Sequence, residues 1–295
     1  MDSGPIETVA CVGSSTTAAK GTYPWIAELE SRPQNSRFRF VNFGVGGDLS
    51  FDIVRRLRRV IGLKPDRVII TIGTNDILAS VFPNFRRVVR VWKGLPYEPT
   101  AQRLRETLSI ITRRLRQETD ARIALSSLAP VGEDPHSRDP VQSRLNDLCA
   151  TYADVIWDVS SHEGTDYIGF YEAFRDELES SKTAKPFTRF SFPAFYRDYL
   201  VREMILRRSF DEISRINGWS FTSTAFISIP AVDGFSRRPF SGSWTRPEPC
   251  RAVFSRSSPR SWCDRREGAA SDAVPSAACR ALPGTRRRGR RCRRR

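Results

Sequence analysis

Five short apolar runs mark the first 160 residues of the chain. They are rich in Val, Ile and Phe, and they are nearly continuous rather than alternating with polar residues, which is typical of strands covered on both faces. The runs occupy residues 7–13, 38–44, 67–73, 121–128 and 153–159. We predict a strand at each of these positions.

The segments between these runs carry apolar residues at three- and four-residue intervals, which indicates helices. Thr100 can cap the start of the clearest of them. The apolar face of that helix consists of Leu104, Leu108, Ile111 and Leu115. Strands that alternate with helices favour a parallel, doubly wound sheet with right-handed crossovers. The pattern therefore predicts an α/β protein with a five-stranded parallel sheet.

The remaining 135 residues of the chain change character twice. Residues 170–181 and 196–216 have helical spacing, and the aromatic stretch between them, 185–195, is expected to form a cap or an extended return. From Phe235 onward the chain lacks Lys, Ile, Tyr, Asn, Met, His and Gln, so it cannot bury enough apolar surface to fold. We predict one domain over residues 5–234 and a disordered, Arg-rich tail over 235–295.

The strongly basic composition belongs to this tail. Of 48 basic and 33 acidic residues, 17 basic and 4 acidic ones lie in 235–295, which gives the tail a charge of +13 and residues 1–234 a charge of +2. The excess of basic residues in the whole chain is therefore no argument that the predicted domain, residues 5–234, binds nucleic acid. Nucleic acid is an expected partner only if the tail is a genuine segment.

Cysteine usage and hydropathy exclude several further classes of protein. Four of the six cysteines lie in the tail, and their spacing matches neither a disulfide framework nor a zinc site, so we expect no metal. Cys11 and Cys149 are interpreted as core residues. The chain shows no signal peptide and no apolar stretch long enough for a membrane span. We expect an intracellular, cytoplasmic protein.

Small and polar residues follow three of the predicted strands. Residues 13–21 (GSSTTAAKG) follow the first strand, 44–50 (GVGGDLS) follow the second, and 73–76 (GTND) follow the third. Ligand sites in doubly wound sheets lie beyond the carboxyl ends of the strands. We therefore expect the three clusters to converge on one site.

These clusters contain the groups that acyl transfer requires. Ser15 can supply a hydroxyl nucleophile, while its own N–H, the N–H of Gly47 and the side-chain amide of Asn75 can supply donors to an oxyanion. Each signal also has a simpler interpretation, because a serine after a strand commonly caps a helix and GTND can form an Asx turn. Residues 44–47 lack the third glycine of a dinucleotide-binding loop, which disfavours that function.

In this order and on these strand ends, the clusters resemble the SGNH hydrolase superfamily, also called GDSL-type lipases or esterases. The first block of that family appears here as Gly13-Ser14-Ser15, its glycine block spans residues 42–47, and its third block is Gly73-Thr74-Asn75-Asp76. The resemblance is strong over residues 7–160 and faint from 160 to 234.

The resemblance implies a three-layer, flavodoxin-like α/β/α fold that hydrolyses a small-molecule ester through an acyl-enzyme, without metal or cofactor. Ser15 would be the nucleophile, and Ser15 N–H, Gly47 N–H and Asn75 would form the oxyanion hole. The GxSxG elbow of the α/β-hydrolases is absent from the chain.

The last block of the family, Asp-x-x-His, is disrupted. It would fall at Asp233-Gly234-Phe235-Ser236, which leaves Asp233 as a triad candidate but removes the base. A serine without an imidazole partner has no group to take its proton near neutral pH, so we expect turnover to be impaired. His136 and His162 both follow predicted strands, and either is an alternative base.

The composition of the tail suggests why the expected histidine is missing. Its missing residue types mostly have codons that begin with A or CA, and this composition is typical of out-of-frame reading of a GC-rich coding sequence. We hypothesise that the frame changes inside the last block. The alternative is a catalytically inactive SGNH-fold binding protein with a basic nucleic-acid-binding or localisation tail.

Translation of the other two reading frames beyond Ser223 tests the frame hypothesis directly. We expect one frame to give a histidine soon after an Asp-Gly pair, followed by an amphipathic helix. If neither frame does so, the tail is genuine and the binding-protein interpretation takes over.

Overall fold

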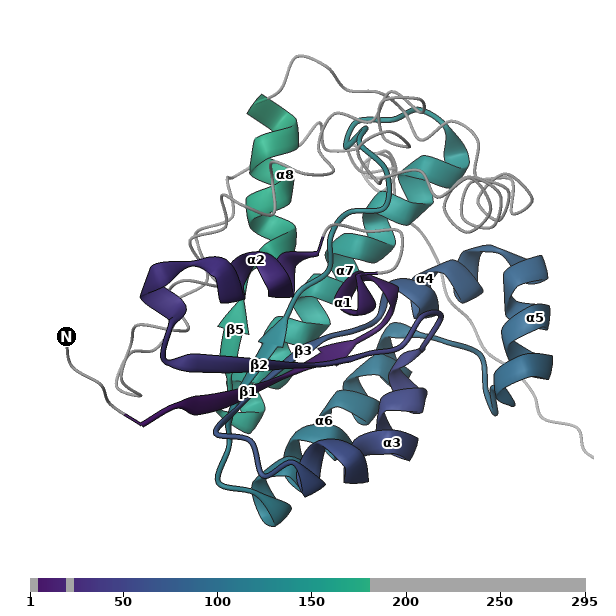
Figure 1. Ribbon diagram of the computed structural model, residues 1–295. Helices are drawn as coiled ribbons and strands as arrows, with labels where there is room; N and C mark the ends of the chain where they lie inside the picture. The colour runs from purple at the N-terminus through teal and green to yellow at the C-terminus, as the bar shows by residue number, and fades with distance from the viewer. Residues whose placement is uncertain (1–4, 20–23, 181–295) are drawn as a thin grey trace, which may run out of the picture. The chain divides into compact units, whose positions relative to one another are not determined.

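A computed structural model describes residues 5–19 and 24–180. Within these residues, five strands form one fully parallel sheet in the order β2-β1-β3-β4-β5 (Figure 1). The strands are β1 (Glu7–Gly13), β2 (Phe38–Gly44), β3 (Arg67–Thr71), β4 (Arg122–Ser126) and β5 (Asp166–Ile168). The predicted α/β class and parallel sheet are confirmed.

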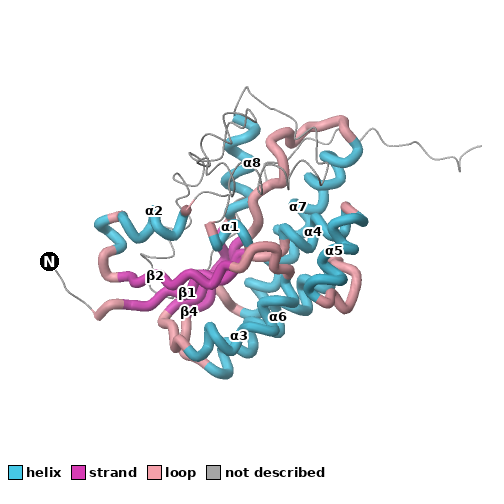
Figure 2. The backbone as a smooth tube through the Cα atoms, turned by 45° about the vertical axis from the view of Figure 1, so that its right-hand side comes forward, coloured by secondary structure: helices cyan, strands magenta, loops and turns pink. Residues whose placement is uncertain are grey.

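Helices cover both faces of the sheet (Figures 1 and 2). Along β1, side chains alternate between two cores: Ala10 and Val12 face one, while Val9 and Cys11 face the other. The larger core is built with helices α3, α6 and α7, and the smaller one with α2. The described helices are α1 (Ser15–Ala18), α2 (Trp25–Ser31), the 3-10 helix η1 (Pro33–Asn35), α3 (Ser50–Gly62), α4 (Thr74–Val81), α5 (Pro83–Lys93), α6 (Ala101–Glu118), α7 (Pro140–Glu163) and α8 (Phe170–Ser180).

Helix α6 forms as its sequence predicts. Thr100 Oγ1 accepts a hydrogen bond from Arg103 N at 3.1 Å, so it caps the helix. The predicted apolar face is fully buried, since Leu104, Leu108, Ile111 and Leu115 are at most 1% exposed. Cys11 and Cys149 are also buried free cysteines, which confirms their interpretation as core residues.

The fifth predicted strand, at residues 153–159, is wrong, because this run lies inside helix α7. Asp139 caps that helix by accepting hydrogen bonds from Val141 N and Gln142 N, both at 2.9 Å, and Gly164 ends it with a φ of +60°. The run looks continuous because α7 buries a wide face, while Asp154 stays exposed. The true fifth strand, β5, is only three residues long.

The connections between the strands create a switch point beside β1. Helices α1 and α2 join β1 to its outer neighbour β2, and the chain then crosses back through α3 to β3 on the other side of β1. Ligands of doubly wound sheets bind where the connections diverge in this way, at the carboxyl ends of the strands. The expected site therefore lies at the ends of β1 and β3.

Several sequence predictions lie outside the described residues. They are the helix at 196–216, the stretch 185–195, the triad candidate Asp233, Ser236, and the tail 235–295. Among the helices that are described, none is both long and apolar enough to cross a bilayer. Residues 5–19 and 24–180 contain no group of His, Cys, Asp or Glu side chains that could hold a metal ion.

Candidate active site

Ser15 lies just after the end of β1, at the switch point. Ser15 begins the short helix α1 directly after Gly13 and Ser14, and it is partly exposed, whereas Ser14 is buried. Two glycines make this arrangement possible by close approach. A Cβ atom on Gly13 would lie 2.5 Å from the Thr71 carbonyl oxygen, and one on Gly44 would lie 2.1 Å from the Ala18 nitrogen. Glycine at these positions lets the end of β1 lie close to the backbone of β3, and the end of β2 lie close to the backbone of α1.

The glycine block after β2 forms a tight turn against β1. Asp48 N donates to the Val45 carbonyl at 3.2 Å, and Gly47, the third residue of this turn, has a φ of +73°. Val45 N donates to the Gly13 carbonyl at 3.1 Å. The turn that carries the Gly47 N–H is thereby tied to the strand that carries Ser15.

Asn75 reaches the same turn from the end of β3. It lies in the first turn of α4, is buried, and donates a hydrogen bond from Nδ2 to the Asp48 carbonyl at 2.8 Å. A side-chain amide has two N–H groups, and this hydrogen bond uses one of them. The structure thus links the predicted clusters around Ser15, Gly47 and Asn75 into one hydrogen-bonded unit.

Comparison with known proteins identifies the family of the chain. Residues 11–187 match the GDSL-like lipase/acylhydrolase family. The chain belongs to this family. No curated protein matches it.

Solved structures with a similar fold include two hydrolases. The chain is 17% identical to an acetylxylan esterase from Geobacillus stearothermophilus, with a TM-score of 0.47 over 71% of this chain and 98% of that one. It is 19% identical to an alpha/beta hydrolase enzyme from the metagenome of Lake Arreo, Spain, with a TM-score of 0.46 over 70% of this chain and 98% of that one.

The two histidines of this GDSL-like protein occupy opposite edges of the sheet. His162 lies in the last turn of α7, just before β5 begins, so it is at the amino-terminal edge, away from Ser15. The prediction that His162 follows a strand was wrong, because residues 153–159 are part of helix α7. His162 therefore does not lie on the side of the candidate site. His136 is exposed on the connection after β4, at the carboxyl-terminal edge.

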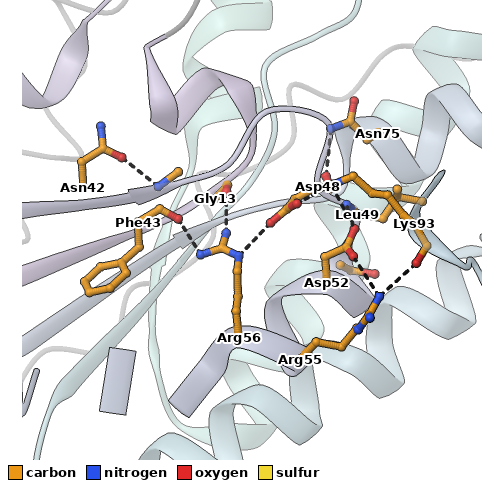
Figure 3. A network of polar contacts seen from close by, with 12 residues as sticks. Gly13, Asn42, Phe43, Asp48, Leu49, Asp52, Arg55, Arg56, Asn75 and Lys93 are labelled. Atoms are coloured by element: carbon orange, nitrogen blue, oxygen red, sulfur yellow. Dashed lines mark hydrogen bonds and ion pairs between the residues drawn. The ribbon is translucent and has the colours of Figure 1, made fainter. Parts of the chain in front are cut away.

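A cluster of buried charges beneath the turn was not predicted from the sequence. Figure 3 shows Asp48 between Arg56 of α3 and Lys93 at the end of α5, with Asp52 nearby. A carboxylate directly after the glycine pair was visible in the sequence. Its partners were not, because they are 8 and 45 residues away along the chain.

The aromatic ring nearest to Gly47 is that of Trp92. A Cβ atom on Gly47 would lie 3.5 Å from Trp92 Cζ3, and the Trp92 residue is nevertheless 68% exposed. Val45 in the same turn is 42% exposed. The described surface next to Gly47 is therefore apolar in part, and it comes from the last turn of α5 and from Val45 in the glycine turn itself.

Asp76, the residue after Asn75, is buried and contacts Ser50 at the start of α3. Its carboxylate accepts hydrogen bonds from Ser50 N at 3.0 Å and Ser50 Oγ at 2.7 Å. Burial raises the pKa of Asp76 to about 6, and the charge of Asp52 adds to the rise, while the bonds from Ser50 oppose it. Because this folded-state pKa lies above the unfolded value, ionisation of Asp76 costs stability as the pH rises from about 4 to 6.

Replacing Asp76 by asparagine is expected to remove this pH dependence. Each pKa unit corresponds to about 1.4 kcal/mol, so the stability of the parent relative to Asp76→Asn should fall by on the order of 3 kcal/mol between pH 4 and pH 7. Urea unfolding of both proteins at the two pH values measures the change. The exposed Asp147→Asn is the control, and an equal difference at both pH values would contradict the prediction.

Proposed function

We propose that this chain is an ester hydrolase that acts through an acyl-enzyme on Ser15, with turnover impaired because the family's catalytic histidine is absent. The oxygen of the Ser15 hydroxyl attacks the ester carbonyl and forms a tetrahedral intermediate, while its proton passes to water or to a base in solution, from which the departing alcohol later takes a proton. The N–H groups of Ser15 and Gly47 and the Asn75 amide hold its negative oxygen. Collapse releases the alcohol, and water then releases the acid from Ser15.

One observation carries this proposal. The Asn75 amide donates to the carbonyl of Asp48, the residue that follows Gly47, so the side-chain donor and the backbone donor belong to one hydrogen-bonded unit. That unit is bonded through Val45 N to Gly13, two residues before Ser15. A nucleophile and donors held together at a switch point are what acyl transfer requires.

An added base tests the proposal in the full chain. Imidazole in solution can take the proton of Ser15 in place of the missing side chain, and a positioned general base contributes about 10²–10⁴-fold. We expect protein-dependent hydrolysis of p-nitrophenyl acetate to rise with imidazole by an amount towards the lower end of this range. Imidazole without protein gives the blank, and a protein-dependent rate that does not respond to imidazole would refute the proposal.

Restoring the base in the chain is a second test. Asp233 and Ser236 lie outside the described residues, so Ser236→His asks whether that segment can reach Ser15. A gain in turnover that is lost again on Ser15→Ala would support an impaired esterase with Asp233 as the triad carboxylate.

A catalytically inactive binding protein is the alternative, and the missing Asp-x-x-His block is the observation that favours it. It predicts no Ser15-dependent turnover under any of these conditions. A genuine basic tail would then bind RNA with an affinity that falls steeply as salt increases.

A further inference from the structure

Arg56 ties three separate parts of the candidate site together. Its Nη2 donates to the Gly13 carbonyl at 2.9 Å, and its Nη1 donates to the Phe43 carbonyl at 2.7 Å (Figure 3). Its Nε donates to Asp48 Oδ2 at 2.7 Å. One planar guanidinium therefore spans the end of β1, the end of β2 and the glycine turn, which no other side chain type can do with a single fixed geometry.

Lys93, at the end of helix α5, contacts the same carboxylate of Asp48. Its Nζ donates to Asp48 Oδ1 at 2.5 Å and lies 3.5 Å from Asp52 Oδ2. The Asp48 side chain is 4% exposed, that of Lys93 is 10% exposed and that of Arg56 is 14% exposed. Arg55 Nη1 donates to the Lys93 carbonyl at 2.9 Å and fixes the end of α5 in turn. Both carboxylate oxygens of Asp48 are thus held by buried cations.

Asp48 is the residue through which Arg56 and Lys93 act on two of the three proposed oxyanion donors, the Gly47 N–H and the Asn75 amide. Its peptide nitrogen follows Gly47, which has no side chain of its own to anchor it. Its carbonyl oxygen accepts the hydrogen bond from Asn75 at 2.8 Å. Oxyanion donors stabilise charge only when they are already oriented towards it, so a flexible glycine turn needs such an anchor.

We propose that Arg56 and Lys93 are positioning residues, which hold Asp48 and the strand ends so that the Gly47 N–H and Asn75 keep the geometry needed in the transition state. This inference rests on the proposed ester hydrolysis. The proposal gives the charged side chains of Arg56, Lys93 and Asp48 a role other than stabilising the fold, since buried ion pairs contribute little to stability compared with apolar packing. It also makes the last turn of α5 part of the site.

Four variants of the full chain test the inference. Arg56→Gln removes the clamp, Arg56→Lys keeps the charge but cannot bridge three acceptors, and Lys93→Gln removes the second cation. Arg58→Gln is the matched control, because Arg58 is an exposed arginine on the same helix. Each protein is measured by thermal unfolding, by imidazole-supported hydrolysis of p-nitrophenyl acetate, and by amide hydrogen exchange of peptides that cover residues 13–18 and 42–49.

We expect Arg56→Gln to lower kcat by roughly 10- to 10²-fold with KM within about twofold, since small displacements of positioned groups have effects of this size. Arg56→Lys and Lys93→Gln should fall between Arg56→Gln and the parent. Exchange of the two peptides should accelerate in the same order and stay unchanged in Arg58→Gln. A folded Arg56→Gln with the kcat and exchange of the parent would overturn the inference.

Two further outcomes are also decisive. If Arg56→Gln does not fold, Lys93→Gln carries the test, because Lys93 contacts the carboxylates but is not the side chain that bridges the strand-end carbonyls; unchanged kcat and exchange in Lys93→Gln would then refute the role. If the parent shows no imidazole-supported turnover but exchange still accelerates in Arg56→Gln, the proposed hydrolysis fails while the clamp on the turn stands.

Discussion

Ser15→Ala is expected to remove all of the imidazole-supported turnover and to leave only the rate of imidazole without protein together with the protein's small residual rate in plain buffer. In enzymes with a complete triad, loss of the serine costs on the order of 10⁶ in kcat, and this cost arises because the triad acts as a unit. This chain lacks the histidine of the triad, so in buffer without imidazole Ser15→Ala should change the residual rate of hydrolysis very little. The hydrolysis of p-nitrophenyl acetate with and without imidazole separates the two cases.

The neighbouring serine provides a matched control for this prediction. Ser14 is buried, and Ser14→Ala should retain imidazole-supported turnover. A large loss from Ser15→Ala in plain buffer would show that the chain holds its own base. His136 is then the histidine to replace first, since it lies at the same edge of the sheet as Ser15.

Gly44→Ala is expected to destabilise the domain by about 3 kcal/mol or more. The new Cβ atom would lie 2.1 Å from Ala18 N and 2.6 Å from Ala18 Cα, and both are backbone atoms that move only if α1 and β2 separate. The strain falls on the helix that carries Ser15. Chemical denaturation gives the loss in free energy of unfolding.

Gly46→Ala is the matched control for this substitution. Gly46 lies in the same loop, and a Cβ atom there has no described atom within 4 Å. We expect its free energy of unfolding to stay within about 0.5 kcal/mol of the parent, as for surface substitutions generally. If the two variants are equally stable, β2 does not pack against α1 as closely as described.

Local pattern predicted most of the fold but not its last strand. The runs at 7–13 and 38–44 match β1 and β2 to the residue, because both are short and nearly continuously apolar, although β2 lies at the edge of the sheet and only its Phe38 is buried. The run at 153–159 satisfies the same rule while it belongs to a helix. A wide apolar helical face and a buried strand give the same signal over seven residues, and only the caps at Asp139 and Gly164 distinguish them.

The candidate site was predictable where its chemistry follows directly on a strand. Ser15, Gly47 and Asn75 each lie within a few residues of a strand end, so topology alone brings them to one edge. The clamp on Asp48 was not predictable in this way. Its parts come from three elements, and pairing between α3, α5 and a turn depends on tertiary packing rather than on spacing along the chain.

The buried clamp also has a genetic consequence. Every described group that would hold the oxygen of an ester, together with the cations that fix Asp48, is encoded between codons 13 and 93, whereas the position of the missing base lies far downstream at 236. A change of reading frame near codon 236 would leave the upstream part intact. Loss of the base and loss of the anion-holding half are therefore separate mutational events, and repair of the first requires no change in the second.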